Sequence, residues 1–280
     1  MKNFYQKVTS ILLLSFTIPI ETKISIPKLP SRISSFFSRN KEEIIHKEFN
    51  HIKKLELLCE HGDVSIKTWK QPCVLVELRK KGSELFLQSV TLQCSSKDNI
   101  LQVSTSMTDA SLSGTLTLQI FVPETLPIKV ATTENNISIE NLSGAIDAQT
   151  TYGAINIFEG TNTVIAKTTQ GNILVQRLSM QTEHSLNIAT QHGNITVAVP
   201  QSMNCDIQAQ SLHGKIQSDL FITLRPPTML LNDETFKELK HNIHAIIGQP
   251  RQDQEIATML LSSEFGVIKI IPYDLKKKIK

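Results

Sequence analysis

The sequence contains few aromatic residues and little net charge. Aromatic residues make up 5% of the 280 residues, and 29 basic residues against 26 acidic ones leave a formal charge of +3. Surfaces that bind nucleic acids need a strongly basic patch, and those for single strands also need rings that stack on bases. We therefore predict no nucleic-acid partner. Hydrophobic residues, at 40%, suffice to bury a core, so a disordered chain is not expected either.

Motifs of catalytic and cofactor sites are absent. The sequence has no His-Glu-x-x-His, Gly-x-Ser-x-Gly, Gly-x-Gly-x-x-Gly or Walker motif, and no calcium-binding Gly-Gly-x-Gly-x-Asp nonapeptide. Ser38 and Lys41 fit Ser-x-x-Lys, but without the partner motifs that acylation requires. We predict that the protein is not an enzyme, and assign it no catalytic, cofactor-binding or metal-binding residue and no cofactor.

Cysteine is scarce, and its spacing does not indicate a metal site. Cys59, Cys73, Cys94 and Cys205 form no Cys-x-x-Cys pair and have no histidine pair at zinc spacing. In an exported chain, Cys59 and Cys73 would be the most reachable disulfide, because they lie in neighbouring predicted strands. Four free thiols are the equal alternative.

The N-terminus carries a targeting signal. Lys2 and Lys7 precede an uncharged, largely apolar run from Val8 to Ile20, which has the length of a signal peptide and is short for a membrane span. Residues 1–20 are therefore a signal peptide or, because Thr17 to Lys23 contains no Ala-x-Ala, an N-terminal anchor; a buried N-terminal strand or helix is the remaining alternative. Either a signal peptide or an anchor predicts an exported or membrane-anchored protein of the periplasm or cell envelope, whose N-terminus can associate with the membrane.

Two further segments lie outside the predicted folded region. Residues 21–41 are rich in proline and serine and form a linker. Residues 273–280 form a basic tail with lysines at 276, 277, 278 and 280, which we interpret as a solvated terminus. Contact of this tail with an anionic lipid surface is the alternative.

A short repeated unit dominates the remainder of the chain. A glycine, one variable residue and then an apolar residue that opens a strand-like segment recur at Gly62, Gly144, Gly153, Gly171, Gly193, Gly214 and Gly266. In the middle third, Asn136 and Asn162 join these glycines in a period of about nine residues. Glycine and asparagine adopt positive φ most readily, so we predict a left-handed turn residue after each strand of about five residues.

These spacings predict an all-β fold, a β-solenoid with short strands and Gly/Asn turns. Two strands per rung fit the interval from Gly153 to Gly171, and looser rungs follow to Gly193 and Gly214. Alternating apolar residues over 42–125 predict an antiparallel β-sandwich-like segment before the solenoid. Residues 228–248 are the exception, since Asn232 to Gly248 has helical periodicity, although Ile243, Ala245 and Ile247 also alternate as in a strand.

The pattern resembles a known family. The runs from Glu48 to Leu57, from His61 to Trp69 and from Val74 to Leu78, the Gly-x-Ile-x-Val units, and the closing Ser262 to Ile270 resemble the DUF4097 β-strand-repeat family, also labelled adhesins. The resemblance covers roughly residues 43–272, and we place the β-repeat domain at 42–272. It implies an exported or envelope-associated protein without agreed catalytic residues. The stretch 228–248 and the missing lipidation cysteine depart from that pattern.

Three sets of polar residues are candidate sites. His61, His192 and His213 each precede a turn glycine, and on adjacent rungs His192 and His213 could share a metal, but we interpret them as solvated turn residues. Paired carboxylates would indicate a glycan-cleaving enzyme. The candidates Asp63, Glu140, Asp147 and Glu159 are scattered. Asn172 and Asn194 follow repeat glycines and are expected to stabilise the turns.

The leading hypothesis is a non-enzymatic, envelope-associated β-repeat protein that presents an extended polar face for adhesion or scaffolding. Its partner is not identified by the sequence, and an envelope component or a surface glycan is the expected class. A polysaccharide-acting enzyme on a parallel β-helix is one alternative, and a self-assembling structural solenoid is another.

Overall fold

The computed structural model describes residues 41–177, 183–225, 241–248 and 256–273. All described residues belong to one compact unit, residues 39–280. The predicted signal peptide or anchor, linker residues 21–40 and tail residues 274–280 lie outside the described residues. No helix within the described ranges is both long and apolar enough to cross a bilayer.

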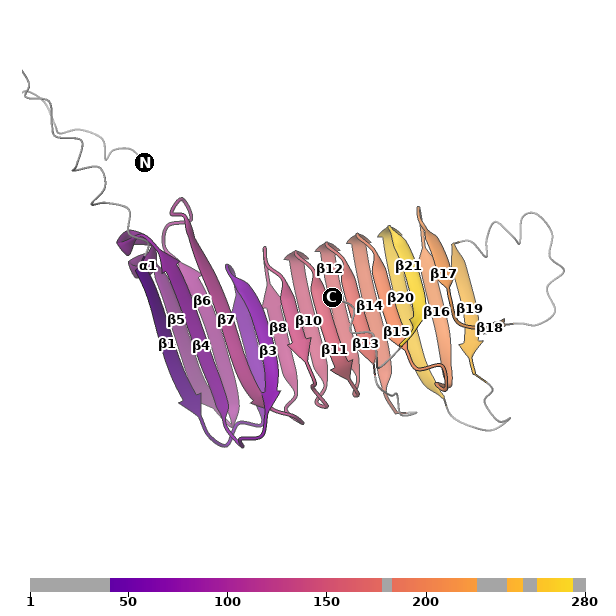
Figure 1. Cartoon of the computed structure of the whole chain (residues 1–280), viewed down its shortest axis with the longest axis horizontal. Helices are drawn as coiled ribbons and strands as arrows, with labels where there is room; N and C mark the ends of the chain where they lie inside the picture. The colour runs from indigo at the N-terminus through magenta and orange to yellow at the C-terminus, as the bar shows by residue number, and fades with distance from the viewer. Residues whose placement is uncertain (1–40, 178–182, 226–240, 249–255, 274–280) are drawn as a thin grey trace, which may run out of the picture. The chain divides into compact units, whose positions relative to one another are not determined.

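Two sheets contain all the long strands of the described residues (Figure 1). In spatial order, the ten-stranded sheet consists of β1 (Lys41–Phe49), β4 (Val74–Gly82), β7 (Gly114–Pro123), β3 (Asp63–Trp69), β9 (Ile137–Glu140), β11 (Ile155–Gly160), β13 (Ile173–Arg177), β15 (Ile195–Val199), β21 (Val267–Pro272) and β17 (Lys215–Ser218). The eleven-stranded sheet consists of β18 (Ile222–Leu224), β19 (Asn242–Ile247), β16 (Cys205–Ser211), β20 (Ala257–Phe265), β14 (Ser185–His192), β12 (Val164–Gln170), β10 (Ile146–Tyr152), β8 (Ile128–Thr132), β2 (Lys54–Cys59), β6 (Ile100–Met107) and β5 (Val90–Lys97).

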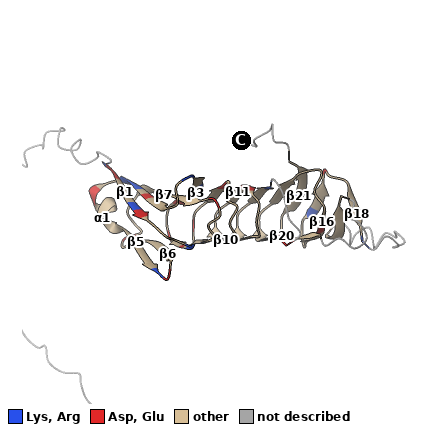
Figure 2. Ribbon diagram, turned by 90° about the horizontal axis from the view of Figure 1, so that it is seen from below, with Lys and Arg blue, Asp and Glu red and all other residues tan. Residues whose placement is uncertain are grey.

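Each repeat contributes one strand to each sheet, and this makes a rung. The rung of β12 and β13 pairs in parallel with the rungs on either side. Val164 and Ala166 of β12, like Ile173 and Val175 of β13, are buried between the sheets, whereas the residues between them face outward. Figure 2 shows the two sheets as two layers. The predicted all-β solenoid is therefore confirmed, because period-two alternation buries one face of every strand.

The N-terminal end is closed by antiparallel strands and a short helix. β1 pairs with β4, β4 with β7, and β5 with β6, all antiparallel. The antiparallel pairing expected over 42–125 occurs there, while β2 and β3 already form a parallel rung. Helix α1 (Glu84–Ser89) begins where the Ser83 side chain accepts a hydrogen bond from the Phe86 amide. Buried Lys80 of β4 links α1 to β1, since its ammonium donates to the Leu87 carbonyl at 2.9 Å and pairs with Glu43 at 2.8 Å.

The C-terminal strands do not follow the order of the chain. The rung of β20 and β21 lies between the rung of β14 and β15 and that of β16 and β17 (Figure 1). The rungs at Gly193 and Gly214, expected to be adjacent, are thus separated by the rung at Gly266. The helical prediction for Asn232 to Gly248 is wrong where the structure describes it, because Asn242–Ile247 is strand β19, antiparallel to β16. Residues 226–240 lie outside the described residues.

The repeat glycines are required for space rather than for positive φ. Among them only Gly62, with φ of 99°, is clearly left-handed, and φ of Gly171, 159°, is nearly extended. A Cβ built on Gly193 would overlap the carbonyl oxygen of Gly171 on the neighbouring rung, and the same holds along the row of turns. The register places Asn135, not Asn136, beside Gly153. The left-handed turn prediction is therefore wrong for most of the repeats.

All four cysteines are free thiols, so the Cys59–Cys73 disulfide is not formed. Cys59 ends β2 in one sheet, and its Sγ donates to the His61 carbonyl at 3.0 Å. Cys73 lies just before β4 in the other sheet, and its carbonyl accepts a hydrogen bond from Trp69 Nε1 at 2.8 Å. Burial raises the pKa of the Cys205 thiol to about 12.

One arginine is buried in the interior. Arg177, the last residue of β13, is fully buried, and its Nη2 donates to the Asn162 carbonyl at 2.6 Å. Burial lowers the pKa of Arg177 to about 10. The hydrogen bond links the end of one rung to the turn before it, so we interpret Arg177 as a structural residue.

Candidate functional site

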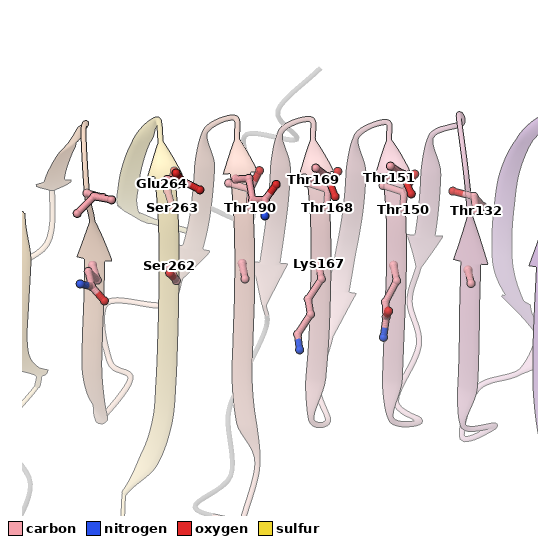
Figure 3. A pocket seen from close by; sticks show the side chains of 16 residues that line it. Thr132, Thr150, Thr151, Lys167, Thr168, Thr169, Thr190, Ser262, Ser263 and Glu264 are labelled. Carbon is pink, nitrogen blue, oxygen red and sulfur yellow. The ribbon is translucent and has the colours of Figure 1, made fainter.

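A hollow of about 680 Å³ lies on the outer face of the eleven-stranded sheet. Six neighbouring strands line it near their carboxyl ends, in the order β8, β10, β12, β14, β20 and β16. Figure 3 shows several of the side chains that line it. They are mostly hydroxyls and amides, and the charged side chains among them are Lys167 and Glu264. A surface of this composition can donate and accept many hydrogen bonds without selecting for charge.

Outward-facing side chains form two parallel rows in this hollow. Strand register places Gln149 beside Lys167, and Ser262 beside Gln210. Two residues further along each strand comes the second row, with members Thr151, Thr169, Gln191, Glu264 and Leu212. Because parallel strands are in register, the residues of each row lie at equal heights on neighbouring strands. The rows are therefore a repeated surface, with one copy per rung.

Beneath these rows, a ladder of buried hydroxyl groups holds the turns in place. Each hydroxyl donates to the carbonyl of a turn residue on the neighbouring rung. The bonds are Thr150 to Asn135, Thr168 to Gly153, Thr190 to Gly171 and Ser263 to Gly193, each of 3.2 Å, and Ser211 to Gly266 of 2.8 Å. Sequence reasoning missed this ladder, although Thr or Ser three residues before five of the turn glycines was a signal for it. The hydroxyls of this ladder are already used in hydrogen bonds within the fold, so a ligand would contact the side chains of the outward rows instead.

A second hollow, also of about 680 Å³, lies on the same face towards the N-terminal end. It is lined by β5, β6, β2 and β8, and Ala131 of β8 lines both hollows. Glu56 is its charged centre, where it accepts hydrogen bonds from Lys54 at 2.7 Å and Gln102 at 3.3 Å. These bonds lower the pKa of the Glu56 carboxyl. Lys129 also lines this hollow.

The structure separates the three candidate histidines. Phe265 lies between His192 and His213, with ring centroids 4.9 Å from the first and 4.6 Å from the second. The prediction that these two histidines occupy adjacent rungs is wrong, because the rung of β20 and β21 is inserted between them. His61 lies in the distant turn between β2 and β3. Across the described ranges, no group of three or more His, Cys, Asp or Glu side chains is placed to hold a metal ion.

The four acidic candidates are dispersed and have separate partners. Asp147 lies on the eleven-stranded sheet, and the other three lie on the ten-stranded sheet. The partners are Asn136 for Asp63 at 3.2 Å, Lys67 for Glu140 at 3.7 Å and Gln149 for Asp147 at 2.9 Å. Burial, followed by the nearby charge of Glu159, raises the pKa of the Tyr273 hydroxyl. None of these carboxylates lines either hollow.

The asparagines after the repeat glycines stabilise the turns, as predicted. Asn172 Oδ1 accepts a hydrogen bond from the Asn194 amide at 2.8 Å, and Asn194 Oδ1 accepts one from the Val267 amide at 2.8 Å. Each side chain thus links its turn to the next rung. They lie in the turns between the two sheets and line neither hollow.

Comparison with known proteins identifies the fold. A family model described as Toastrack DUF4097 matches residues 14–259. No curated protein matches the chain. A solved "putative cell adhesion protein" from Clostridium sporogenes superposes with a TM-score of 0.50 at 15% identity, covering 84% of this chain and 100% of that one. A "putative adhesin" from Bacteroides fragilis gives 0.32 at 12% identity, covering 81% and 97%, and a "putative lipid binding protein" from Parabacteroides distasonis gives 0.30 at 11%, covering 81% and 96%. At such identities the likeness shows the fold alone.

Proposed function

The chain belongs to the Toastrack DUF4097 family, and from this premise we propose that it is a non-catalytic adhesion protein of the cell envelope. The outer face of the eleven-stranded sheet is the proposed contact surface. The name of the solved structure from Clostridium sporogenes, a cell adhesion protein, supports this class of function. The apolar run from Val8 to Ile20 supports export.

The observation that carries the proposal is the chemistry of the first hollow. Its outward rows offer amides and hydroxyls from five consecutive strands, β10, β12, β14, β20 and β16, with Lys167 and Glu264 as the charged members. Figure 2 shows Lys, Arg, Asp and Glu gathered near β1 and α1, while the ribbon between β10 and β20 is mostly uncharged. A face that presents mostly neutral side chains at equivalent positions on successive rungs suits weak contacts with an extended, uncharged partner, each contact small and their sum large.

The placement of the carboxylates supports a non-catalytic role. Glu264 lines the first hollow and Glu56 the second. Five interstrand spacings separate their strands, β20 and β2, so at ~4.8 Å per spacing the two strands lie roughly 24 Å apart, and Glu264 is displaced a further four residues along its strand from the position in register with Glu56. Glycoside hydrolysis needs two carboxylates separated by about 5 to 9.5 Å.

Three of the four edge strands of the described residues support adhesion over self-assembly. In the described residues, β1 is the edge of the ten-stranded sheet at one end and carries the charged run Lys41, Glu42 and Glu43. At the other end, β17 has four residues and β18 has three. Charged or very short edge strands discourage pairing with another chain.

The proposal is tested by sedimenting the purified full-length chain with envelope preparations from the organism that encodes it. We expect the wild-type chain to sediment with the envelopes and Ser262→Arg, in the hollow, to reduce the bound fraction at least several-fold. Thr196→Arg is the matched control, because Thr196 lies on a central strand of the other sheet and also faces outward. Equal envelope binding by the two variants would refute the proposal. Recovery of the protein from its own cells at full mass, in the cytosol alone, would also refute it.

A further inference from the structure

The two hollows are lined by one continuous row of side chains. Register places Gln93 opposite Ser104, Ser104 opposite Leu58, and Leu58 opposite Ala131. From Ala131 the row continues, one residue per strand, through Gln149, Lys167, Ala189, Ser262 and Gln210. All of these residues line one hollow or the other. The row crosses β5, β6, β2, β8, β10, β12, β14, β20 and β16, which are consecutive in the sheet. We call it the outer row.

The outer row has a constant spacing. Neighbouring strands lie ~4.8 Å apart, so the eight intervals of the outer row span about 38 Å. A ligand that lies along it, perpendicular to the strands, meets an equivalent position at every step. The ligand that fits is therefore linear and built from units of about that length. A pyranose residue in an extended glycan has a comparable length.

Apart from the edge strand β5, the backbone of these strands is unavailable to a peptide ligand. Each strand from β6 to β20 in this series is paired on both sides, so its N–H and C=O groups are used within the sheet. An extended peptide normally binds by adding to an unpaired sheet edge, which satisfies its own main chain. Along the outer row a ligand would find side chains alone. A peptide lying there would leave much of its main chain without partners.

The side chains of the outer row match the hydroxyl groups of a neutral glycan. Gln93, Gln149 and Gln210 provide amides, and Ser104 and Ser262 provide hydroxyls. Both kinds of group donate and accept hydrogen bonds, as sugar hydroxyls do. The small side chains at Ala131 and Ala189 leave room above the sheet. Lys167 is the one charged member of the row, whereas polyanions are typically recognised by clusters of arginine and lysine.

We propose that the outer row is a single binding track for a linear, largely uncharged glycan, with about one sugar residue per strand. This rests on the proposed adhesion function and names its ligand. Ala131, shared by the two hollows, is the junction through which the chain of sugars passes. A track of repeated subsites predicts that affinity increases with ligand length until the outer row is filled.

The experiment is a titration of the full-length protein with two neutral series, β-1,4-linked glucose and β-1,4-linked N-acetylglucosamine, from disaccharide to decasaccharide. For the series that binds, we expect the dissociation constant to fall about tenfold or more from tetrasaccharide to octasaccharide and to level off near nine units, one per strand. A dissociation constant independent of length beyond the disaccharide would overturn the single track.

A variant at the junction tests the continuity of the track. Ala131→Arg places a long cationic side chain between the two hollows. We expect it to leave tetrasaccharide binding unchanged but to stop the gain in affinity at about five units, the number of outer-row strands beyond β8 in the first hollow. Thr196→Arg, on the other sheet, should keep the full length dependence. Equal loss of short and long ligands in Ala131→Arg, with an unchanged melting temperature, would contradict the proposal.

The failure of this inference can be told apart from failure of the adhesion function. The wild-type chain could bind envelopes, lose that binding in Ser262→Arg, and yet bind neither glycan series. That result would refute the neutral-glycan track and leave the adhesion surface intact. Competition of envelope binding by an anionic glycan or a peptide, but not by these oligomers, would do the same. If the wild-type chain did not bind envelopes at all, both the glycan track and the adhesion function would be refuted.

Discussion

Replacing Gly193 with alanine tests why the repeat has glycine at its turns. A Cβ on Gly193 would overlap the carbonyl oxygen and carbon of Gly171. Both atoms belong to the backbone, so no side-chain rotation can relieve the clash. The turns of two adjacent rungs must separate instead, and they are held together by several hydrogen bonds.

The structure sets the expected size of the effect. Thr190 Oγ1 donates to the Gly171 carbonyl at 3.2 Å, and the Gly171 amide donates to the His192 carbonyl at 2.9 Å. Losing two such bonds costs about 1 kcal/mol each, and overpacking adds about 1 to 3 kcal/mol. We expect Gly193→Ala to lower the free energy of unfolding by about 3 to 5 kcal/mol.

The assay is urea unfolding followed by far-UV circular dichroism, with Gly160→Ala as the control. A Cβ on Gly160 would meet the Ile157 side chain at 3.4 Å, an ordinary contact, so the control should change stability by about 0.5 kcal/mol or less. Gly193→Asn separates the two explanations of the glycine. A left-handed turn would accept asparagine, whereas a close approach rejects it as it rejects alanine. Loss of less than about 1 kcal/mol in Gly193→Ala would refute the reasoning.

Two further predictions concern buried polar groups. Lys80→Met removes the ammonium that pairs with Glu43 and donates to the Leu87 carbonyl. We expect it to lower the free energy of unfolding, measured in urea, by about 1 to 3 kcal/mol. An unchanged unfolding midpoint would contradict the role of Lys80 in closing the N-terminal end. The folded state favours the neutral Cys205 thiol, whose pKa is raised from 9.0 to about 12, so its stabilising effect is complete below pH 9 and is lost as pH rises towards 12. Stability measured over that range should fall more steeply in the wild type than in Cys205→Ala, and parallel curves would show that the thiol does not contribute.

The solenoid could be predicted from the sequence because its signal is local. Strands need alternating apolar residues, and β11, with Ile155 and Ile157 inward, shows them within a few residues. The turn-stabilising role of Asn172 and Asn194 could also be predicted, because each asparagine directly follows a repeat glycine. The turn glycines were located correctly but explained wrongly, because the clash that excludes a Cβ comes from another rung and not from the local dihedral angles.

The candidate site could not be located from sequence. An extended polar face was expected, but strands of both sheets have polar outer residues, and neither hollow has a sequence signature. The outer row joins Gln93 to Gln210 through register alone, and its path runs through β20, which the chain reaches only after β16 and β19. The same insertion separates His192 from His213 with Phe265.

The sequence by itself determined that this protein is an all-β repeat, because strand periodicity and turn chemistry are properties of a few neighbouring residues. It also determined what is missing, namely the motifs of catalysis and the charge of a nucleic-acid surface. Only the tertiary structure decided the order of the rungs and the sheet that carries the hollows. Those depend on which strands pair, and pairing between segments as distant as Thr190 and Ser263 is governed by the shared core and the matching hydroxyl ladder, not by local sequence.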